Sequence, residues 1–503
     1  MIYRAIGQLV QYGVVKGLMK AADAVYTYNR LLEILALPGD GENSGQSAIQ
    51  KHTLHELLAL LTDDACMRGI IADTQGSRDL FDTRLMGALT PQPSVVAERF
   101  AQKYKVSPIQ AADWFYDFSQ NVNYIRADRI DRDIRWQSET EYGALDITIN
   151  MSKPEKDPRD IAAAKSMPAQ GYPRCLLCAE TEGYAGRADF PARQNHRIVP
   201  LSLCGEKWGF QYSPYVYYHQ HCIVLNTKHV PMVIEPRTFD LLFDFLRFFP
   251  HFIVGSNADL PIVGGSILSH EHFQGGNYNF PMAKAPVEHS FTLERFPGVS
   301  AGIVRWPLSV IRLRGGSPEA LSAAASHILS VWRGYSDKAV DILAKSGGEP
   351  HNTVTPIARL RDKQYELDVV LRNNRRSKRH PLGIFHPHGE YHHIKKENIG
   401  LIEVMGMAIL PSRLRKELEE INLAIRENKP SPSPLHADWV KALTGRYAQE
   451  GRPMRKMTEA EIEAILRAEV GKVFRGVLEN CGVFKRDETG KQAFLKFIAA
   501  ITA

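Results

Sequence analysis

The spacing of apolar residues predicts a helical region at the start of the chain. Thr53-Leu54-His55-Glu56 has the pattern of a capping box, and apolar residues follow it at helical spacing through Leu61. Residues 100–118 show the same spacing, with an interruption near Pro108. We therefore expect helices over most of residues 1–140.

The middle of the chain changes to the period of two that is typical of β-strands. Ala144–Asn150 alternates and is rich in β-branched residues, which predicts a strand. Further strands are expected within residues 212–226, 303–313, 367–372 and 399–410, and helices at 238–249 and 318–343. The order strand, helix, strand and histidine cluster occurs at about residues 210–280 and again at 300–411, which indicates a weak internal duplication.

The end of the chain returns to helical spacing. Residues 412–427 form a strongly charged helical pattern. Pro430-Ser431-Pro432-Ser433-Pro434 predicts a stiff, extended linker. Thr458-Glu459-Ala460-Glu461 is a second capping-box pattern, and it starts a long helix that we expect to end near Gly482.

The stretch Leu260–Phe280 combines apolar residues with an unusual set of polar ones. If residues 267–274 are extended, His270, His272 and Gln274 share one face, and the residues between them take the other. Glycines flank this segment and allow sharp turns or a close approach to a ligand: Gly264, Gly265, Gly275 and Gly276. The pattern fits a functional site, but a polar strand facing solvent would show it too.

A pair of cysteines indicates a metal site. Cys175 and Cys178 form a CxxC motif, which is half of a tetrahedral set, and zinc would need two more ligands. The candidates for these ligands are four histidines: His219, His221, His229 and His270. A redox pair or two structural cysteines remain alternatives, although no thioredoxin-like βαβ pattern begins at this motif.

His272 is a candidate nucleophile. A neutral imidazole can attack phosphorus and hold a nucleotidyl group covalently, which divides one difficult displacement into two easier ones. This chemistry requires the other ring nitrogen to be held by a carbonyl or carboxylate, and it requires donors at the phosphate oxygens. Gln274, two residues further on, can supply such a donor without competing for the proton.

Two other polar clusters compete for a functional role. The stretch from His386 to His393 is richer in histidine, and it fits a catalytic, metal-binding or substrate-binding loop or simply an exposed turn. Residues 372–379 contain five basic side chains that could meet a phosphate, although a solvated run of charges is the commoner case. Asn123-Tyr124-Ile125-Arg126 mixes aromatic, amide and guanidinium groups and fits a substrate contact or a charged helix end.

Composition restricts the class of protein. The 503 residues are 44% apolar and 23% charged, which is typical of a soluble globular protein. A net charge of +6 permits anionic small substrates but does not indicate nucleic-acid binding. No apolar run is long enough to predict a membrane span, and the polar residues within Met1–Lys20 favour an amphipathic helix over a signal peptide. Six cysteines, four of them scattered and two in the CxxC motif, are too few for a disulfide scaffold and predict a reduced, cytoplasmic protein.

Several of these motifs together resemble the galactose-1-phosphate uridylyltransferases of the second, Firmicutes-type class. The resemblance spans nearly the whole chain, and its most specific part is the string Ser269-His270-Glu271-His272-Phe273-Gln274-Gly275-Gly276. It includes Asn123–Arg126, Ile149–Pro158 and Phe385–Glu390 as well.

The resemblance implies an α+β fold of two tandem histidine-triad-like halves with mixed or antiparallel sheets. It divides the chain into a helical N-terminal region (1–140), a first half with the metal site and nucleophile (141–290), a second half (291–411) and a C-terminal helical region (412–503). The implied activity is the exchange of UMP between UDP-glucose and galactose 1-phosphate in the Leloir pathway, by a ping-pong mechanism through a uridylyl-histidine. Related enzymes are commonly dimers and use no organic cofactor.

The resemblance also implies roles for individual residues. His272 would be the nucleophile, and Gln274 would steady the uridylyl phosphate. Zinc would be held by Cys175, Cys178, His229 and His270, and substrate contacts would come from Asn257, Arg126 and Ser269. A second metal site, known in the first class, could draw on residues of the later cluster, but these residues cannot be matched to it one by one.

The histidine string departs from related patterns at two positions, and two other functions stay open. Glu271 stands where the first class has proline, and Gln274 replaces the third histidine of hydrolytic triad proteins. A phosphorylase of the same superfamily would pass the nucleotidyl group to inorganic phosphate. A zinc-stabilised protein that binds sugar nucleotides without turnover is the alternative outside enzymes.

Overall fold

The computed structural model describes residues 2–39, 52–152, 171–265 and 267–503. Contacts divide the chain into two compact units. The first unit comprises residues 1–132, 152–216 and 220–230, and the second comprises 133–151, 217–219 and 231–503. The four predicted segments follow sequence motifs rather than contacts, and that division stays a prediction. Most of the loop predicted at Ser152–Pro158 lies outside the described residues.

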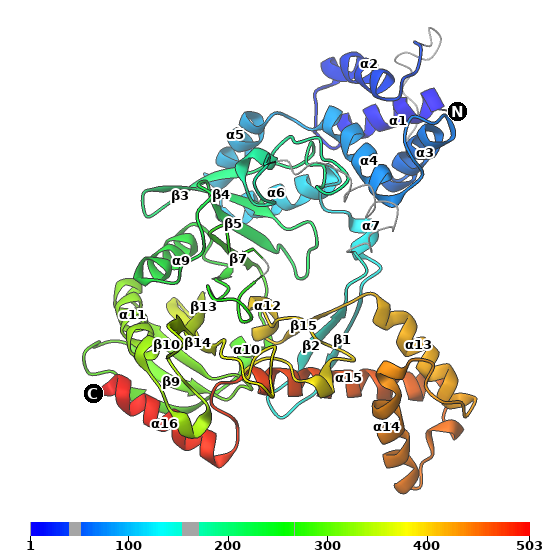
Figure 1. The fold of residues 1–503 in the computed structure, drawn as a ribbon. Coiled ribbons are helices and arrows are strands. Elements are labelled where there is room, and N and C mark those ends of the chain that lie inside the picture. The colour runs from blue at the N-terminus through cyan, green and yellow to red at the C-terminus, as the bar shows by residue number, and fades with distance from the viewer. Residues whose placement is uncertain (1, 40–51, 153–170, 266) are drawn as a thin grey trace. The chain divides into compact units, whose positions relative to one another are not determined.

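The first unit begins with helices, as the apolar spacing predicted (Figure 1). The capping box forms, because Thr53 Oγ1 accepts from the Glu56 amide at 3.3 Å and Glu56 Oε2 accepts from the Thr53 amide at 2.7 Å. The helices are α1 (Ile2–Val15), α2 (Ala24–Ile34), α3 (Leu54–Met67), α4 (Gln75–Leu89), α5 (Pro93–Tyr104), α6 (Pro108–Asn121) and α7 (Ala127–Ile130). The pattern over residues 100–118 covers two helices, since Ser107 caps α6 and Pro108 occupies its first turn.

Three antiparallel strands follow in the same unit. They are β3 (Val199–Leu203), β4 (Glu206–Tyr212) and β5 (Cys222–Asn226), paired in sequence order. Aromatic rings of α5, α6 and β4 pack together, with ring centroids of Phe100 and Phe115 5.9 Å apart and those of Phe115 and Phe210 5.7 Å apart. The Tyr212 hydroxyl donates to the Ala112 carbonyl of α6 at 2.8 Å. The packing of these aromatic rings, together with this hydrogen bond, holds α5 and α6 against the sheet.

The second unit contains a larger antiparallel sheet in the order β7-β6-β13-β14-β10-β9-β8. Its strands are β6 (Ile253–Gly255), β7 (His272–Gly276), β8 (Val287–Thr292), β9 (Ser300–Val304), β10 (Val310–Gly315), β13 (Asn352–Arg361) and β14 (Gln364–Asn373). Residues 303–313 therefore hold parts of two strands rather than one. Helices α9 (Pro236–Phe248) and α11 (Pro318–Gly334) lie side by side against it (Figure 1). The helix predicted over 318–343 ends early, at Gly334.

A second, smaller sheet in this unit packs against α15 (Glu459–Cys481). Its strands β1 (Ile134–Ser138) and β2 (Leu145–Ile149) are antiparallel, and β15 (Met407–Leu410) pairs with β2 in parallel. The strand predicted at Ala144–Asn150 is thus confirmed. The segment predicted as a strand at 399–410 instead contains the short helix α12 (Leu401–Val404) before β15.

The remaining helices lie at the end of the second unit. They are α13 (Arg413–Arg426), α14 (Ala437–Gln449) and α16 (Glu488–Thr502), in addition to α15. The one-turn helix α10 (Pro281–Lys284) comes earlier, between β7 and β8. Thr458 and Glu461 form the predicted capping box of α15. Among the described residues, every helix is too short or too polar to cross a membrane.

Candidate active site and metal centre

Strand β7 carries the predicted nucleophile. The strand begins at His272, so the expectation that residues 267–271 are part of it was wrong. His272 and Gln274 lie on one face of β7, because they are two residues apart in a strand. His270 precedes the strand, which means that its side chain does not share this face by strand alternation.

The ring of His272 is fixed by the backbone two residues earlier. Its Nδ1 lies 2.8 Å from the carbonyl oxygen of His270. A carbonyl only accepts, so Nδ1 carries the proton and Nε2 carries the lone pair. The side chain is 5% exposed, and burial lowers the pKa of His272 to about 4. The imidazole is therefore neutral at pH 7 and is held in the tautomer that a nucleophile attacking through Nε2 requires.

The residue directly before β7 is held by an ion pair. Glu271, which is buried, accepts from Arg237 of α9 at 2.8 Å. The sequence marks Glu271 only as a departure from the first class, and no motif points to Arg237. Nothing in the spacing of these two residues, 34 positions apart, indicates the contact.

Close backbone packing explains two of the flanking glycines. A Cβ on Gly264 would lie 2.5 Å from the Ala258 carbonyl oxygen, and one on Gly265 would lie 2.7 Å from Asn257 Nδ2. Asn257 is buried, and its Oδ1 accepts from the Leu401 amide at 2.9 Å. Ser269, the other predicted substrate residue of this segment, is exposed.

The predicted zinc ligands come together. The ligand atoms of Cys175, Cys178, His229 and His270 all lie within 4.8 Å of one another. Cys178 Sγ is 3.1 Å from His229 Nδ1 and 3.5 Å from Cys175 Sγ. Two sulfurs and two imidazoles are a donor set that suits a tetrahedral site. This Cys/His cluster can bind a metal ion.

The structure separates these four residues from the other histidines considered as ligands. His219 and His221 do not join the cluster. The backbone carbonyl of His221 accepts from the Ser213 amide at 2.7 Å, and that of His219 accepts from the Asn277 amide at 3.2 Å. The expected order, a cysteine pair followed by a histidine just past a strand, thus selects His229 after β5.

The later histidine cluster is anchored mainly to its own backbone. His388 Nε2 lies 3.0 Å from the Ile384 carbonyl oxygen, and His392 Nε2 lies 2.9 Å from that of Pro387. His386 Nε2 faces Asn398 Oδ1 at 3.1 Å. Within the described part of the chain, residues 386–393 do not form a group of three or more metal-ligating side chains.

The basic run is not a uniform solvated face. Arg372 is buried and donates to the Ile399 carbonyl at 2.9 Å. Arg375 donates to the backbone and side chain of Asp341. Its first members therefore stabilise the fold, and the exposed ones are Arg376, Lys378 and Arg379.

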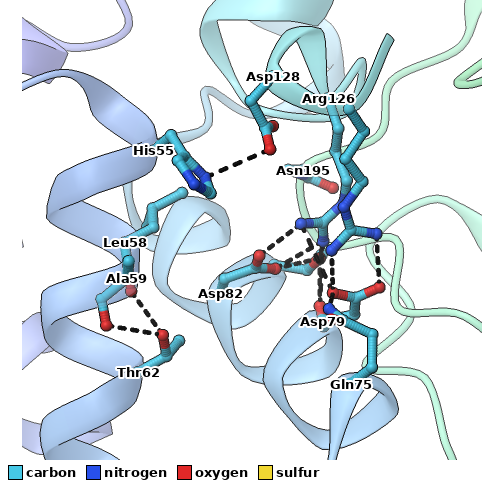
Figure 2. Close-up of polar contacts among 12 residues, drawn as sticks. His55, Leu58, Ala59, Thr62, Gln75, Asp79, Asp82, Arg126, Asp128 and Asn195 are labelled. Atoms are coloured by element: carbon cyan, nitrogen blue, oxygen red, sulfur yellow. Dashed lines mark hydrogen bonds and ion pairs between the residues drawn. The ribbon is translucent and has the colours of Figure 1, made fainter. Parts of the chain in front are cut away.

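Arg126, a predicted substrate residue, has a carboxylate partner in the first unit (Figure 2). Its Nη1 and Nη2 reach the two carboxylate oxygens of Asp82 on α4, at 2.5 and 2.7 Å. Next to this pair, Arg129 makes a two-point contact with Asp79. Sequence reasoning missed both aspartates, because they lie more than forty residues before the arginines.

The α+β fold thus combines a histidine of fixed tautomer on a strand with a Cys/His cluster that could bind a metal ion. Two family models match the chain. One for the N-terminal domain of galactose-1-phosphate uridyl transferase matches residues 44–231, and one for the C-terminal domain matches residues 246–440. The chain belongs to the galactose-1-phosphate uridylyltransferase family.

Curated relatives match over nearly their full length. The galactose-1-phosphate uridylyltransferase of Bacillus subtilis is 49% identical, over 100% of this chain and 98% of the relative. That of Caldanaerobacter subterraneus is 49% identical over 98% and 96%, and that of Clostridium acetobutylicum is 49% identical over 99% of each chain. A solved structure of yeast Ap4A phosphorylase matches with a TM-score of 0.34 and 13% identity over 65% of this chain and 91% of that chain, a likeness that supports no conclusion here.

Proposed function

We propose that this protein is a uridylyltransferase of galactose metabolism. It exchanges UMP between UDP-glucose and galactose 1-phosphate through a uridylyl group bound covalently to His272. Relatives with that activity in their names are 49% identical over the whole chain, which supports the reaction. The observation that carries the role of His272 is the 2.8 Å contact between its Nδ1 and the His270 carbonyl oxygen. This contact leaves Nε2 as the nucleophilic atom.

In the first half-reaction, Nε2 of His272 attacks the α-phosphorus of UDP-glucose. The N–P bond forms as the bond to the bridging oxygen breaks, and glucose 1-phosphate leaves with the electron pair. The ring becomes a cation, and the hydrogen bond from Nδ1–H to the His270 carbonyl stabilises it. In the second half-reaction, a phosphate oxygen of galactose 1-phosphate attacks the same phosphorus, and the N–P bond breaks to give UDP-galactose.

The other predicted site residues would bind and orient the substrate. Gln274 follows His272 on the same strand face, and its amide would donate to a phosphate oxygen of the uridylyl group. An amide cannot act as a general base at neutral pH, which favours transfer over hydrolysis. Asn257, Ser269 and Arg126 remain the proposed substrate contacts.

Zinc is the metal that we propose for the Cys/His cluster. Cys175, Cys178, His229 and His270 would hold it, and about one ion per chain is expected for a closed structural site. The ion would supply structural cross-linking. Because the His270 carbonyl fixes the tautomer of His272, an immobilised His270 would keep the nucleophile in position.

The test is to trap the intermediate. Incubation with UDP-glucose alone should add the mass of one UMP to the protein and release one glucose 1-phosphate. His272→Ala should abolish both, whereas His388→Ala, in the rival cluster, should retain the adduct. An active preparation without an adduct, or an adduct that survives in His272→Ala, would refute the role of His272.

The acceptor distinguishes this function from its alternatives. The trapped adduct should pass to galactose 1-phosphate rather than to inorganic phosphate, the acceptor of a phosphorylase. A protein that only binds sugar nucleotides would exchange no label between UDP-glucose and glucose 1-phosphate. A cytoplasmic location and a homodimer stay predictions.

A further inference from the structure

Three polar side chains outside the predicted site form a hydrogen-bonded chain in the second unit. Ser346 Oγ lies 2.5 Å from His351 Nε2, and His351 Nδ1 lies 2.7 Å from Asn374 Oδ1. The serine is exposed, whereas His351 is 7% exposed and Asn374 is half-buried. The proposed uridylyl transfer uses none of these residues.

The direction of donation along this chain follows from its chemistry. The Asn374 oxygen can only accept, so Nδ1 of His351 carries the proton. The lone pair is therefore on Nε2, which accepts from the Ser346 hydroxyl. This order of nucleophile, base and orienting group is the arrangement by which serine or cysteine nucleophiles are activated on unrelated folds.

The base and its orienting residue are held by paired strands. His351 directly precedes β13 and Asn374 directly follows β14, next to the cross-strand pair Asn352 and Asn373. The Asn374 amide donates to the His351 carbonyl at 3.1 Å, and the His351 amide donates to the Ala344 carbonyl at 2.9 Å. These backbone hydrogen bonds hold the chain in place at both His351 and Asn374.

The serine lies on a tight hairpin that a small molecule can approach. Strands β11 (Lys345–Ser346) and β12 (Glu349–Pro350) pair across the turn formed by Gly347 and Gly348. Both glycines have positive φ, of 59° and 85°, and a Cβ on either would meet no atom within 4 Å. The backbone N–H groups of these two glycines follow the nucleophile directly and are candidate donors to an oxyanion.

We propose that Ser346, His351 and Asn374 form a second reactive centre, in which Ser346 accepts an acyl group from small carboxylic esters. The Ser346 oxygen attacks the ester carbonyl as its proton passes to His351 Nε2. The leaving alcohol takes that proton as the C–O bond breaks, which leaves an acyl-serine. Water then attacks the acyl carbon as His351 takes a proton from it. The bond between the acyl carbon and the Ser346 oxygen breaks, and His351 returns the proton to that oxygen, which releases the carboxylic acid and the free serine.

The experiment is labelling of the full chain with a fluorophosphonate, followed by peptide mapping. Serine attacks the phosphorus and fluoride leaves, so the adduct reports an activated hydroxyl. We expect one adduct, on Ser346, which is lost in Ser346→Ala and forms about 100-fold more slowly in His351→Gln. Ser346 should also contribute to the hydrolysis of 4-nitrophenyl acetate, and Ser346→Ala should abolish that contribution.

A matched serine provides the control. Ser300 is likewise exposed on a strand, but its hydroxyl donates to the Arg314 carbonyl at 3.1 Å and not to an imidazole. Ser300→Ala should leave the labelling unchanged, and Ser346→Ala should leave uridylyl transfer unchanged. No adduct on Ser346, or equally fast adducts on Ser346 and Ser300, would overturn the proposal and show that the three residues only hold the hairpin. If His351→Gln fails to fold, the comparison of Ser346→Ala with Ser300→Ala decides alone.

Discussion

At the scale of single residues, hydrogen-bond partners decide what each polar side chain can do. His272 and His388 both lie in histidine-rich stretches, and sequence alone cannot rank them on physical grounds. In the structure, His272 Nδ1 faces the His270 carbonyl, so its Nε2 carries the lone pair. For His388 it is Nε2 that faces a carbonyl, that of Ile384, so this atom carries the proton.

The partner of Arg126 gives a prediction that separates a substrate contact from a structural one. Asp82→Asn removes the nearer carboxylate from Arg126, whose side chain is only 18% exposed, and leaves Asp79 at 3.8 Å. We expect the free energy of unfolding to fall by about 1–3 kcal/mol, because the guanidinium loses its two-point partner and keeps only the longer contact with Asp79. Denaturant unfolding measures this loss.

Denaturant unfolding of Arg126→Gln completes the comparison with Asp82→Asn. If the arginine is held for stability, Arg126→Gln destabilises the chain, and the double variant with Asp82→Asn loses less than the sum of the two. If it binds substrate instead, Arg126→Gln raises KM for the sugar nucleotide with little change in unfolding. A stable Asp82→Asn variant would contradict the structural role.

His196 gives a prediction on the pH dependence of stability. Its ring is buried, and its centroid lies 4.5 Å from that of Tyr124. Burial, and then the charges of Arg193 and Arg197, hold the pKa of His196 well below its usual 6.5. The unfolded chain therefore binds a proton that the folded chain excludes, so the contribution is present above pH 6.5 and is lost as the pH falls below it.

We expect the melting temperature of the wild type to drop between pH 7 and pH 5, and to drop less in His196→Phe. Phenylalanine retains the ring contact with Tyr124 but does not ionise. Thermal unfolding at the two pH values measures the difference. Equal drops in both proteins would show that His196 makes no contribution.

At the scale of elements, hydrophobic periodicity located helices and strands, but local chemistry set their ends. The interruption predicted near Pro108 within residues 100–118 is a boundary between two helices, because Ser107 caps a new helix at Pro108. The strand expected from residue 267 begins at His272, five positions later. The segments 303–313 and 399–410 were likewise read as single strands. Turns within apolar stretches are invisible to periodicity, since turn residues can also be apolar.

Two helical glycines test how α15 packs. A Cβ on Gly471 would lie 2.2 Å from the Ser138 side chain of β1, whereas one on Gly445 of α14 would meet no atom within 4 Å. Gly445→Ala should raise the free energy of unfolding by about 0.5–1 kcal/mol, because alanine loses less backbone entropy in a helix.

Gly471→Ala should lower the free energy of unfolding instead, by about 1–3 kcal/mol, since the added methyl overpacks the contact with β1. Ser138→Gly removes the atoms that the methyl would strike, so the double variant should recover part of the loss. A Gly471→Ala variant as stable as Gly445→Ala would show that α15 is not packed this closely. Denaturant unfolding of the four proteins provides the measurement.

At the scale of the whole molecule, the Cys/His cluster draws its ligands from positions 175 to 270 of the chain. A metal ion bound there links segments that are far apart in sequence, and its binding free energy adds to folding stability. We expect metal analysis to find about one zinc per chain. Chelation should lower the melting temperature before any substrate is added.

Cys178→Ser should lose the bound metal and the response of the melting temperature to chelation. Cys204 is the matched control, because it is exposed and lies outside the cluster, so Cys204→Ser should keep both. Full zinc content in Cys178→Ser would contradict the ligand assignment. This outcome would leave the role of His272 unaffected, since the UMP adduct tests that role separately.

The resemblance to a known family implied the α+β class. The sequence by itself determined the positions of most helices and strands, and which residue types could carry chemistry. These features follow from periodicity and from the chemistry of single side chains, which are local. The tertiary structure decided which of the candidate histidines join Cys175 and Cys178, that Arg126 faces Asp82, and that Ser346, His351 and Asn374 form one chain. The partners in these contacts are separated by 5 positions, for Ser346 and His351, to 95 positions, for Cys175 and His270. Such contacts depend on how the chain returns to itself, which local spacing does not encode.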